Sequence, residues 1–238
     1  MSWLTPDWPA PKTVKAIVTT REQGGSTGPY AAFNMALHVG DDPKVVEANR
    51  GTLSQLGCTP AWLNQVHSVD VVPADTQKVL TADANFTREQ KIACTVMTAD
   101  CLPALFCDRA GTVVAAAHAG WRGLAGGILE KTASAMGVEP SDILVWLGPA
   151  IGPHAFEVGP EVREAFLAVR PESERAFRPS AKAGHFYADL YQLARIHLAR
   201  IGVTAVYGGG FCTFNDARFY SYRRAHPTGR MASLIWLD

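Results

Sequence analysis

Two histidines and one cysteine lie at the ends of apolar segments, where a folded sheet exposes side chains that can do chemistry. His118 follows an apolar run that starts at Val113, and His67 and Cys101 end two further segments of similar character. Open α/β sheets usually present their reactive groups at the carboxyl ends of their strands. The sequence therefore offers two imidazoles and one thiolate as a candidate catalytic set.

This set matches the ligand count of a catalytic zinc ion. Zinc is bound tetrahedrally by imidazole nitrogen and thiolate sulfur, and a catalytic site keeps three protein ligands and one open position. A zinc-bound water has its pKa lowered toward neutrality and becomes a nucleophile. We expect one zinc ion held by His67, Cys101 and His118. Copper could substitute for it, because copper binds nitrogen and sulfur sites more strongly.

Other interpretations of the same three residues stay open, because they lack the close spacing of a zinc knuckle. Each has an ordinary structural explanation: His67 as a loop residue, Cys101 as a small buried hydrophobe and His118 as a core histidine. In a second functional interpretation, Cys101 is a nucleophile whose thiol pKa is lowered by either histidine.

The apolar periodicity predicts the elements that must position these residues. Asp42 is expected to cap a helix that Gly57 ends, and the polar region 75–89 is expected to be a loop with Asp83 as its most suggestive acid. Helices are predicted over 43–56, 123–136, 160–169 and 189–201. Strands are predicted over 14–20, 69–72, 92–98, 105–107, 112–117, 143–147, 203–207, 219–222 and 231–236.

Length and charge limit the classes of protein and partner. The 238 residues suffice for a substantial core, and we expect one domain over 1–238. The 22 basic and 22 acidic side chains balance, so nothing favours nucleic acid or an anionic membrane as partner. No signal peptide, membrane-spanning run or disulfide framework is evident. We expect a cytoplasmic monomer with free thiols and a small ligand.

Arg21 is the first candidate for holding an anion. It follows the strand predicted over 14–20 and stands at the root of a loop that contains Gly24 and Gly25. Glycines permit close backbone approach to a ligand, and a guanidinium can hold phosphate or carboxylate with two hydrogen bonds. The alternative is a mobile hairpin with a solvated arginine. The helix predicted after His118 would add backbone N–H groups for an anion at its N-terminus.

A series of short motifs runs in order through nearly the whole chain. They are Thr20-Arg21 with Gly24-Gly25, Asn34, Gly40-Asp41-Asp42, Asn49-Arg50, Gln65-Val66-His67, 98–103, 118–123, 148–152, 156–159, 219–224 and Thr228-Gly229-Arg230. This series resembles the YfiH-type purine nucleoside phosphorylase family, which is also called the multicopper polyphenol oxidase or laccase-domain family. The chain departs from the commoner pattern at His154 and at Asn85-Phe86.

The resemblance implies an α/β (α+β) fold: a single domain with central mixed β-sheets flanked by helices, in α-β-β-α layers, similar to the catalytic fold of cytotoxic necrotizing factor. It implies metal ligands at His67, Cys101 and His118. The activities implied are phosphorolysis of adenosine, inosine, guanosine and methylthioadenosine, together with adenosine deamination. Bacterial members are also linked to peptidoglycan editing, in which a misincorporated residue is removed from a muropeptide precursor.

We therefore expect a zinc-dependent purine nucleoside phosphorylase that uses nucleoside and phosphate. From side-chain chemistry and motif position, the candidates for holding phosphate are Arg21, Arg50, Arg122 and Arg223. Asn34 and Gln65 are the candidates for hydrogen bonds to the sugar or base.

Three other functions are open at this point. One is an amide hydrolase acting on a peptidoglycan precursor with the zinc water or Cys101. Another is a metal-binding protein without enzymatic activity. The third is a copper polyphenol oxidase, which the sequence disfavours because the trinuclear cluster of such an enzyme needs paired His-x-His motifs. The seven histidines of this chain contain no such pair.

Overall fold

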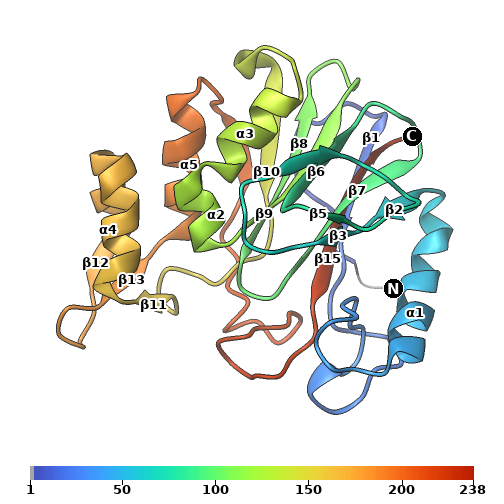
Figure 1. Ribbon diagram of the computed structural model, residues 1–238, viewed down its shortest axis with the longest axis horizontal. Helices are drawn as coiled ribbons and strands as arrows, with labels where there is room; N and C mark the ends of the chain where they lie inside the picture. Colours follow the sequence, from blue (N-terminus) through green and yellow to red (C-terminus); the bar gives the residue numbers. More distant parts are fainter. Residues whose placement is uncertain (1–2) are drawn as a thin grey trace.

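Two sheets packed face to face form the centre of the protein, whose computed structural model describes residues 3–238 (Figure 1). Met1 and Ser2, which begin the segment expected to lack a signal peptide, lie outside the described residues. The larger sheet has the strand order β14 (Ala205–Gly208), β10 (Ile143–Leu147), β8 (Leu102–Asp108), β9 (Val114–Ala119), β6 (Ala84–Thr87) and β4 (Val71–Pro73). The smaller sheet has the order β1 (Val14–Val18), β15 (Met231–Leu237), β7 (Ile92–Thr98) and β2 (Thr59–Ala61).

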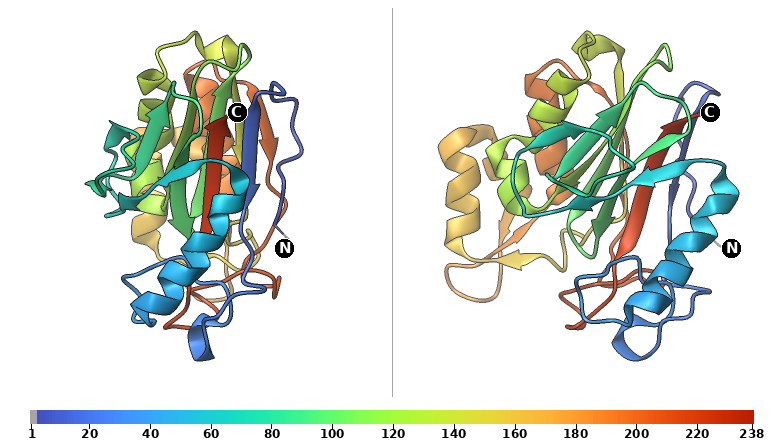
Figure 2. Two further views of the ribbon diagram at one scale, coloured as in Figure 1. Left: turned by 90° about the vertical axis from the view of Figure 1, so that its right-hand side faces the viewer. Right: turned by 45° about the vertical axis from the view of Figure 1, so that its right-hand side comes forward.

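Helices flank this pair of sheets on both sides (Figure 2). α2 (Trp121–Gly126), α3 (Ile128–Ala135) and α5 (Leu190–Arg200) cover the outer face of the six-stranded sheet, and α4 (Pro160–Val169) packs beside them. α1 (Pro43–Gly51) lies beside the four-stranded sheet. Two small sheets contain β11 (Glu157–Val158), β13 (Phe186–Ala188) and β12 (Phe177–Pro179), and β3 (Leu63–Asn64) with β5 (Leu80–Thr81).

Strand β9 shows how the two halves of the core are built. Ala115 and Ala117 belong to the core between sheet and helices, whereas Val114 and Ala116 belong to the core between the two sheets. Successive side chains of a strand point to opposite faces. A strand covered on both faces is therefore apolar throughout, which leaves His118 as a polar exception at the end of a buried strand.

The mixed α/β fold is confirmed, and most predicted elements are present. The strands over 92–98 and 143–147 and the helix over 160–169 have the predicted bounds. The Asp42 side chain caps α1 by accepting from the Lys44 N–H, and after α1 a 3₁₀ helix (Thr52–Leu56) continues to Gly57. Ends are displaced by one to three residues for the elements predicted at 14–20, 69–72, 105–107, 112–117, 189–201, 203–207 and 231–236.

The helix predicted over 123–136 begins two residues earlier and is two helices. Gly127 lies between α2 and α3 with a φ of 95°, in the left-handed region that glycine adopts without a steric penalty. The apolar pattern alone continues through this glycine and gives no sign of the break. The earlier start places the α2 N-terminus directly after Gly120 and therefore beside the end of β9.

Two predicted segments are wrong. The region 75–89 is not a loop throughout, because it contains β5 and β6. Its polar residues break the apolar alternation that would indicate a strand. Asn85, for example, is fully buried in β6, where its side chain donates to the Ala61 carbonyl. Residues 219–222 form an irregular loop segment instead of a strand. Phe219 and Tyr220 are buried, so their apolar character reflects packing of a loop.

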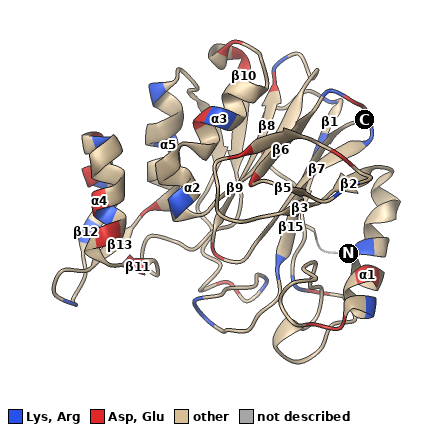
Figure 3. Cartoon of the chain, in the orientation of Figure 1, with Lys and Arg blue, Asp and Glu red and all other residues tan. Residues whose placement is uncertain are grey.

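Charged residues of both signs are interspersed along the helices and loops, and the central strands carry few of them (Figure 3). No helix within residues 3–238 has both the length and the apolar character needed to cross a bilayer.

Candidate functional site

His118 is oriented by a buried carboxylate. It lies near the end of β9 with 3% of its surface exposed, and its Nδ1 lies 2.7 Å from Oδ1 of Asp83. The backbone N–H of His118 also donates to the Asp83 carbonyl oxygen, at 2.7 Å. Because Nδ1 is engaged by the carboxylate, Nε2 is the ring nitrogen left for another partner.

The same carboxylate holds the segment that carries His67. Asp83 is fully buried and accepts hydrogen bonds from the backbone N–H groups of Val66, His67 and Ser68, at 3.2, 3.0 and 2.6 Å. His67 has a φ of 61°, a left-handed conformation that costs energy for a residue with a side chain. The three hydrogen bonds to Asp83 stabilise that conformation. One acid therefore positions both histidines.

Cys101 reaches the site from a tight turn between β7 and β8. Asp100, which precedes it, has a φ of 85°, and its carboxylate accepts from the Thr213 hydroxyl at 2.6 Å and from the Arg223 backbone N–H at 2.7 Å. These bonds hold Asp100 in a structural role. The Cys101 Sγ lies 3.9 Å from Nε2 of His67.

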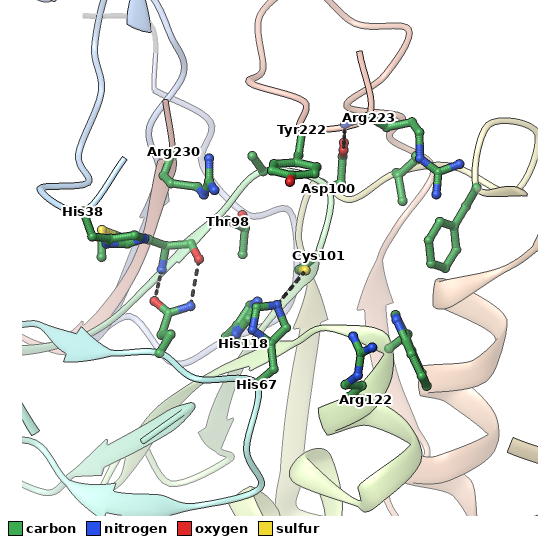
Figure 4. Close-up of a pocket in the computed structure, with 16 residues that line it drawn as sticks. His38, His67, Thr98, Asp100, Cys101, His118, Arg122, Tyr222, Arg223 and Arg230 are labelled. Carbon is green, nitrogen blue, oxygen red and sulfur yellow. Dashed lines mark hydrogen bonds between the residues drawn. The ribbon is translucent and has the colours of Figure 1, made fainter. Parts of the chain in front are cut away.

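The three side chains converge. Ligand atoms of His67, Cys101 and His118 all lie within 4.8 Å of one another, and the two imidazole rings meet nearly edge to face with centroids 4.7 Å apart (Figure 4). Gly120 makes this approach feasible, since a Cβ there would lie 2.7 Å from Cδ2 of His67 and 3.3 Å from Sγ of Cys101.

The charges of the site favour a thiolate. Burial alone raises the pKa of the Cys101 thiol, but the charge and hydrogen bond of His118 and the neighbouring His67 outweigh it and lower the pKa to about 6. Burial likewise lowers the pKa of His118, and the charge of Cys101 with the hydrogen bond to Asp83 raises it to about 9. Burial raises the pKa of Asp83, whereas hydrogen bonds from His118 and Ser68 bring it to about 2. A thiolate and two imidazoles are the donor set that zinc prefers, so these residues fit the ion.

A pocket of about 490 Å³ opens above this set, a volume suited to a small organic ligand. Trp121, Phe156 and Tyr222 give it aromatic walls, and Arg122, Arg223 and Arg230 give it positive charge. In Figure 4 Arg122 and Arg223 lie on one side of the His-Cys-His set, and Arg230 and His38 lie on the other. Its remaining lining residues are Gln65, His67, Met97, Thr98, Ala99, Asp100, Cys101, His118 and Ile151.

Three of the six residues predicted to bind substrate line this pocket: Gln65, Arg122 and Arg223. The amide of Gln65 already pairs with the backbone of Met97, accepting from its N–H at 2.7 Å and donating to its carbonyl at 2.9 Å. The Arg122 guanidinium stacks on Trp121 at 4.3 Å, and the Arg223 guanidinium lies over Phe156 at 5.6 Å while it donates to the Glu157 carbonyl.

Arg21, Asn34 and Arg50, which were also predicted to contact substrate, are not among the residues that line this pocket. Arg21 donates to the Ala31 carbonyl and packs over Tyr220. Asn34 is fully buried and bonds backbone groups and Asp41. Arg50 donates to the Met35 carbonyl and stacks on Trp62. Side-chain donors that could bind a ligand can equally bind the backbone carbonyls of a loop, which also need donors.

Sequence reasoning missed several residues of the pocket wall. His38 and Arg230 are not among the predicted site residues, although Arg230 belongs to the Thr228-Gly229-Arg230 motif of the series. Phe156 and Tyr222 also belong to motifs of the series. Their membership of these motifs is the only sequence signal that they belong to the pocket wall. Only the fold shows that positions so distant in sequence line one cavity.

Fold and site together define a mixed α/β protein with a metal-type site of two histidines and one cysteine. The chain belongs to the family described as multi-copper polyphenol oxidoreductase laccase, whose model matches residues 15–238. It is similar to a purine nucleoside phosphorylase of Pseudomonas aeruginosa, with 63% identity over 100% of this chain and 99% of the relative. It is also similar to the purine nucleoside phosphorylase YfiH of Escherichia coli, with 51% identity over 98% of both chains.

Solved structures agree with this membership. The crystal structure of the Neisseria meningitidis protein NMB0706 matches with a TM-score of 0.97 and 54% identity, covering 100% of both chains. That of YlmD from Geobacillus stearothermophilus matches with a TM-score of 0.93 and 32% identity, covering 100% of this chain and 97% of the other. The resemblance to the YfiH-type family is confirmed.

Proposed function

We propose that the protein is a zinc-dependent purine nucleoside phosphorylase that acts on adenosine, inosine, guanosine and methylthioadenosine, with adenosine deamination as a second activity. The observation that carries the proposal is the convergence of His67, Cys101 and His118 beside a pocket of nucleoside size. The names of the Pseudomonas and Escherichia relatives support the choice of reaction.

Each part of the pocket has a task in this proposal. His67, Cys101 and His118 hold the metal, which supplies Lewis acidity when bound. Trp121 and Phe156 offer flat apolar surfaces to a purine, and the arginines supply positive charge for phosphate. Phosphorolysis forms a bond from a phosphate oxygen to C1′ of ribose and breaks the C1′–N bond, so the walls must also exclude competing water. In deamination, water adds at C6 of adenine and ammonia leaves.

We place this activity in the cytoplasm, with one chain as the working unit. The five cysteines are all free thiols, as expected in a reducing compartment.

The test is a product assay on purified, zinc-loaded protein. Each nucleoside is incubated with and without inorganic phosphate, and free base, ribose 1-phosphate and inosine are quantified. The proposal predicts equimolar base and ribose 1-phosphate that require phosphate, and inosine from adenosine alone. Absence of base release from protein with one zinc per chain would end the phosphorylase proposal.

The lowered pKa of the Cys101 thiol favours a second candidate. A thiolate beside two imidazoles could attack an amide carbonyl, which fits an amide hydrolase that edits a muropeptide precursor. Release of an amino acid from such a precursor, without base release from nucleosides, would favour this candidate. Copper polyphenol oxidation fits less well, because residues 3–238 contain one group of side chains suited to a metal, not the several groups of a multicopper enzyme.

A further inference from the structure

Arg230 carries a half-buried positive charge that has no carboxylate partner among residues 3–238. It lies just before β15, and its Nη1 donates to the carbonyls of Thr228 and Gly229 at 2.9 and 3.0 Å. Nε and Nη2 have no acceptor among residues 3–238, and none of the ion pairs in that range includes Arg230. Burial lowers the pKa of this guanidinium, and the charges of Cys101 and Asp100 partly offset the effect. Such a group attracts an anion that can enter the pocket.

Thr98 adds an unpartnered hydroxyl on the same wall. It is the last residue of β7, is 2% exposed and lines the pocket. Its Oγ1 is buried and has no hydrogen-bond partner in the described part of the chain. The register pairs Thr98 with Met231, the residue that follows Arg230, and both Thr98 and Arg230 line the pocket. A buried hydroxyl is normally hydrogen-bonded, so this pocket-lining residue has a hydrogen bond left to make with a ligand.

His38 completes this end of the pocket. It lines the rim on the same side as Arg230, away from Arg122 and Arg223 (Figure 4). Partial burial and the charges of Arg230 and Arg50 lower the pKa of His38. A neutral imidazole can still donate one hydrogen bond. This end of the pocket therefore combines a guanidinium, a hydroxyl and an imidazole, all of them donors.

We propose that Arg230, Thr98 and His38 form the phosphate subsite, at the end of the pocket away from Arg122 and Arg223, whose guanidinium groups stack on Trp121 and Phe156. The assignment rests on the proposed function, and it replaces Arg21 and Arg50, whose guanidinium groups bind backbone carbonyls outside the pocket. A guanidinium holds phosphate oxygens through charge-assisted hydrogen bonds, and the Thr98 hydroxyl adds a donor that no other group in the described part of the chain uses. The purine then occupies the aromatic end, and the ribose lies between them, beside the His-Cys-His set.

The test uses zinc-loaded protein and two kinds of variant. Thr98→Val removes the hydroxyl with little change in shape, and Thr98→Ser restores it. Arg230→Met removes the charge, and Arg230→Lys retains it. The control is Arg200→Met, an exposed arginine at the end of α5. Calorimetry measures the Kd of inorganic phosphate, and kinetics measure the KM values of phosphate and nucleoside separately.

Arg230→Met should raise the Kd and KM of phosphate roughly 10- to 100-fold, and Thr98→Val should raise them about 3- to 10-fold. The nucleoside KM should change less than about twofold in both. Thr98→Val should keep or increase the Tm, because the hydroxyl has no partner to lose, and Thr98→Ser should bind phosphate as wild type does. A purely structural role for Thr98 or Arg230 would not separate the two KM values.

Unchanged phosphate affinity in both Thr98→Val and Arg230→Met, with phosphorolysis intact, would overturn the subsite and leave the proposed function standing. Phosphate binding that depends on Arg230 and Thr98 in a protein that cleaves no nucleoside would support the subsite and end the proposed function. Failure of the wild-type protein to bind phosphate at millimolar concentration would overturn the subsite.

Discussion

Nδ1 of His118 lies 2.7 Å from Oδ1 of Asp83, and the same carboxylate accepts the backbone N–H of His67. A carboxylate behind a metal-binding histidine fixes the orientation of the ring and raises its basicity as a ligand. Here the carboxylate also stabilises the left-handed turn that carries the second histidine. A substitution of Asp83 should therefore disturb the positions of both histidines without changing any metal ligand.

Asp83→Asn should lower zinc affinity about 10- to 100-fold. In the carboxylate, Oδ1 bonds His118 and the His67 N–H, and Oδ2 bonds the N–H groups of Val66 and Ser68. An amide keeps one acceptor oxygen, so its NH₂ group would face one of these two pairs of donors. Competition with a chelator of known affinity measures the effect. The exposed Asp7→Asn provides the matched control and should bind zinc as wild type does. Equal zinc affinity in both variants would contradict a positioning role for Asp83.

The pH dependence of Cys101 reactivity should reveal its thiolate in metal-free protein. Its folded pKa is lowered to about 6, so the reactive thiolate predominates above that value and disappears as the pH falls through it. The rate of iodoacetamide alkylation should show this transition, with Cys101→Ser subtracting the other partly exposed cysteine, Cys212. A transition near the ordinary thiol pKa of about 8.5 would contradict the predicted influence of the two histidines.

Gly120→Ala should impair the metal site more than the fold. Gly120 has a φ of −61°, which alanine adopts freely, but the new Cβ would lie 2.7 Å from His67. The ring must move, so we expect zinc affinity to fall roughly tenfold or more. The control is Gly51→Ala in α1, where nothing lies within 4 Å of the added Cβ. It should keep zinc affinity and raise stability by about 0.5–1 kcal/mol. Similar zinc affinity in both variants would show that the close approach is unimportant.

Glu130 should contribute stability without contributing to the reaction. Its Oε1 accepts from Nδ1 of His197 at 2.7 Å and from Arg170 at 2.9 Å, joining α3 to α5. Glu130→Gln should cost roughly 2–4 kcal/mol in urea unfolding at about pH 7. Burial raises the pKa of Glu130, but hydrogen bonds from His197 and Arg170 outweigh it and lower the pKa.

The stabilisation by Glu130 is therefore present above its unfolded pKa of about 4.3, and it is lost as the pH falls through the lower folded value. The difference between wild type and Glu130→Gln should shrink over that range. A difference that stays constant down to about pH 3 would assign the effect to packing.

The sequence predicts best those elements whose buried residues give a regular apolar periodicity. The predicted bounds of β7, β10 and α4 agree with the observed ones, because each is a continuous apolar or amphipathic run that fits one type of secondary structure. The strand next to Asp83 does not follow from the sequence, because β6 buries the polar side chain of Asn85, whose partner is the distant Ala61 carbonyl. A contact between residues distant in sequence produces no apolar periodicity in the local sequence.

The convergence of His67, Cys101 and His118 matches the prediction, since each residue lies at the end of a strand or in the turn beside it. The phosphate-binding arginines could not be predicted in the same way. Arg21 and Arg230 are both cations in glycine-containing motifs, and only the fold separates the one that binds a backbone carbonyl from the one that lines the pocket.

The most direct test of the central claim is a zinc titration of metal-free protein in the presence of inosine and phosphate, with hypoxanthine and ribose 1-phosphate measured at each step. We predict that both products form at a rate that rises linearly and reaches its plateau at one zinc per chain, and that Cys101→Ala forms neither. Full phosphorolysis by metal-free protein, or none at one zinc per chain, would contradict the account.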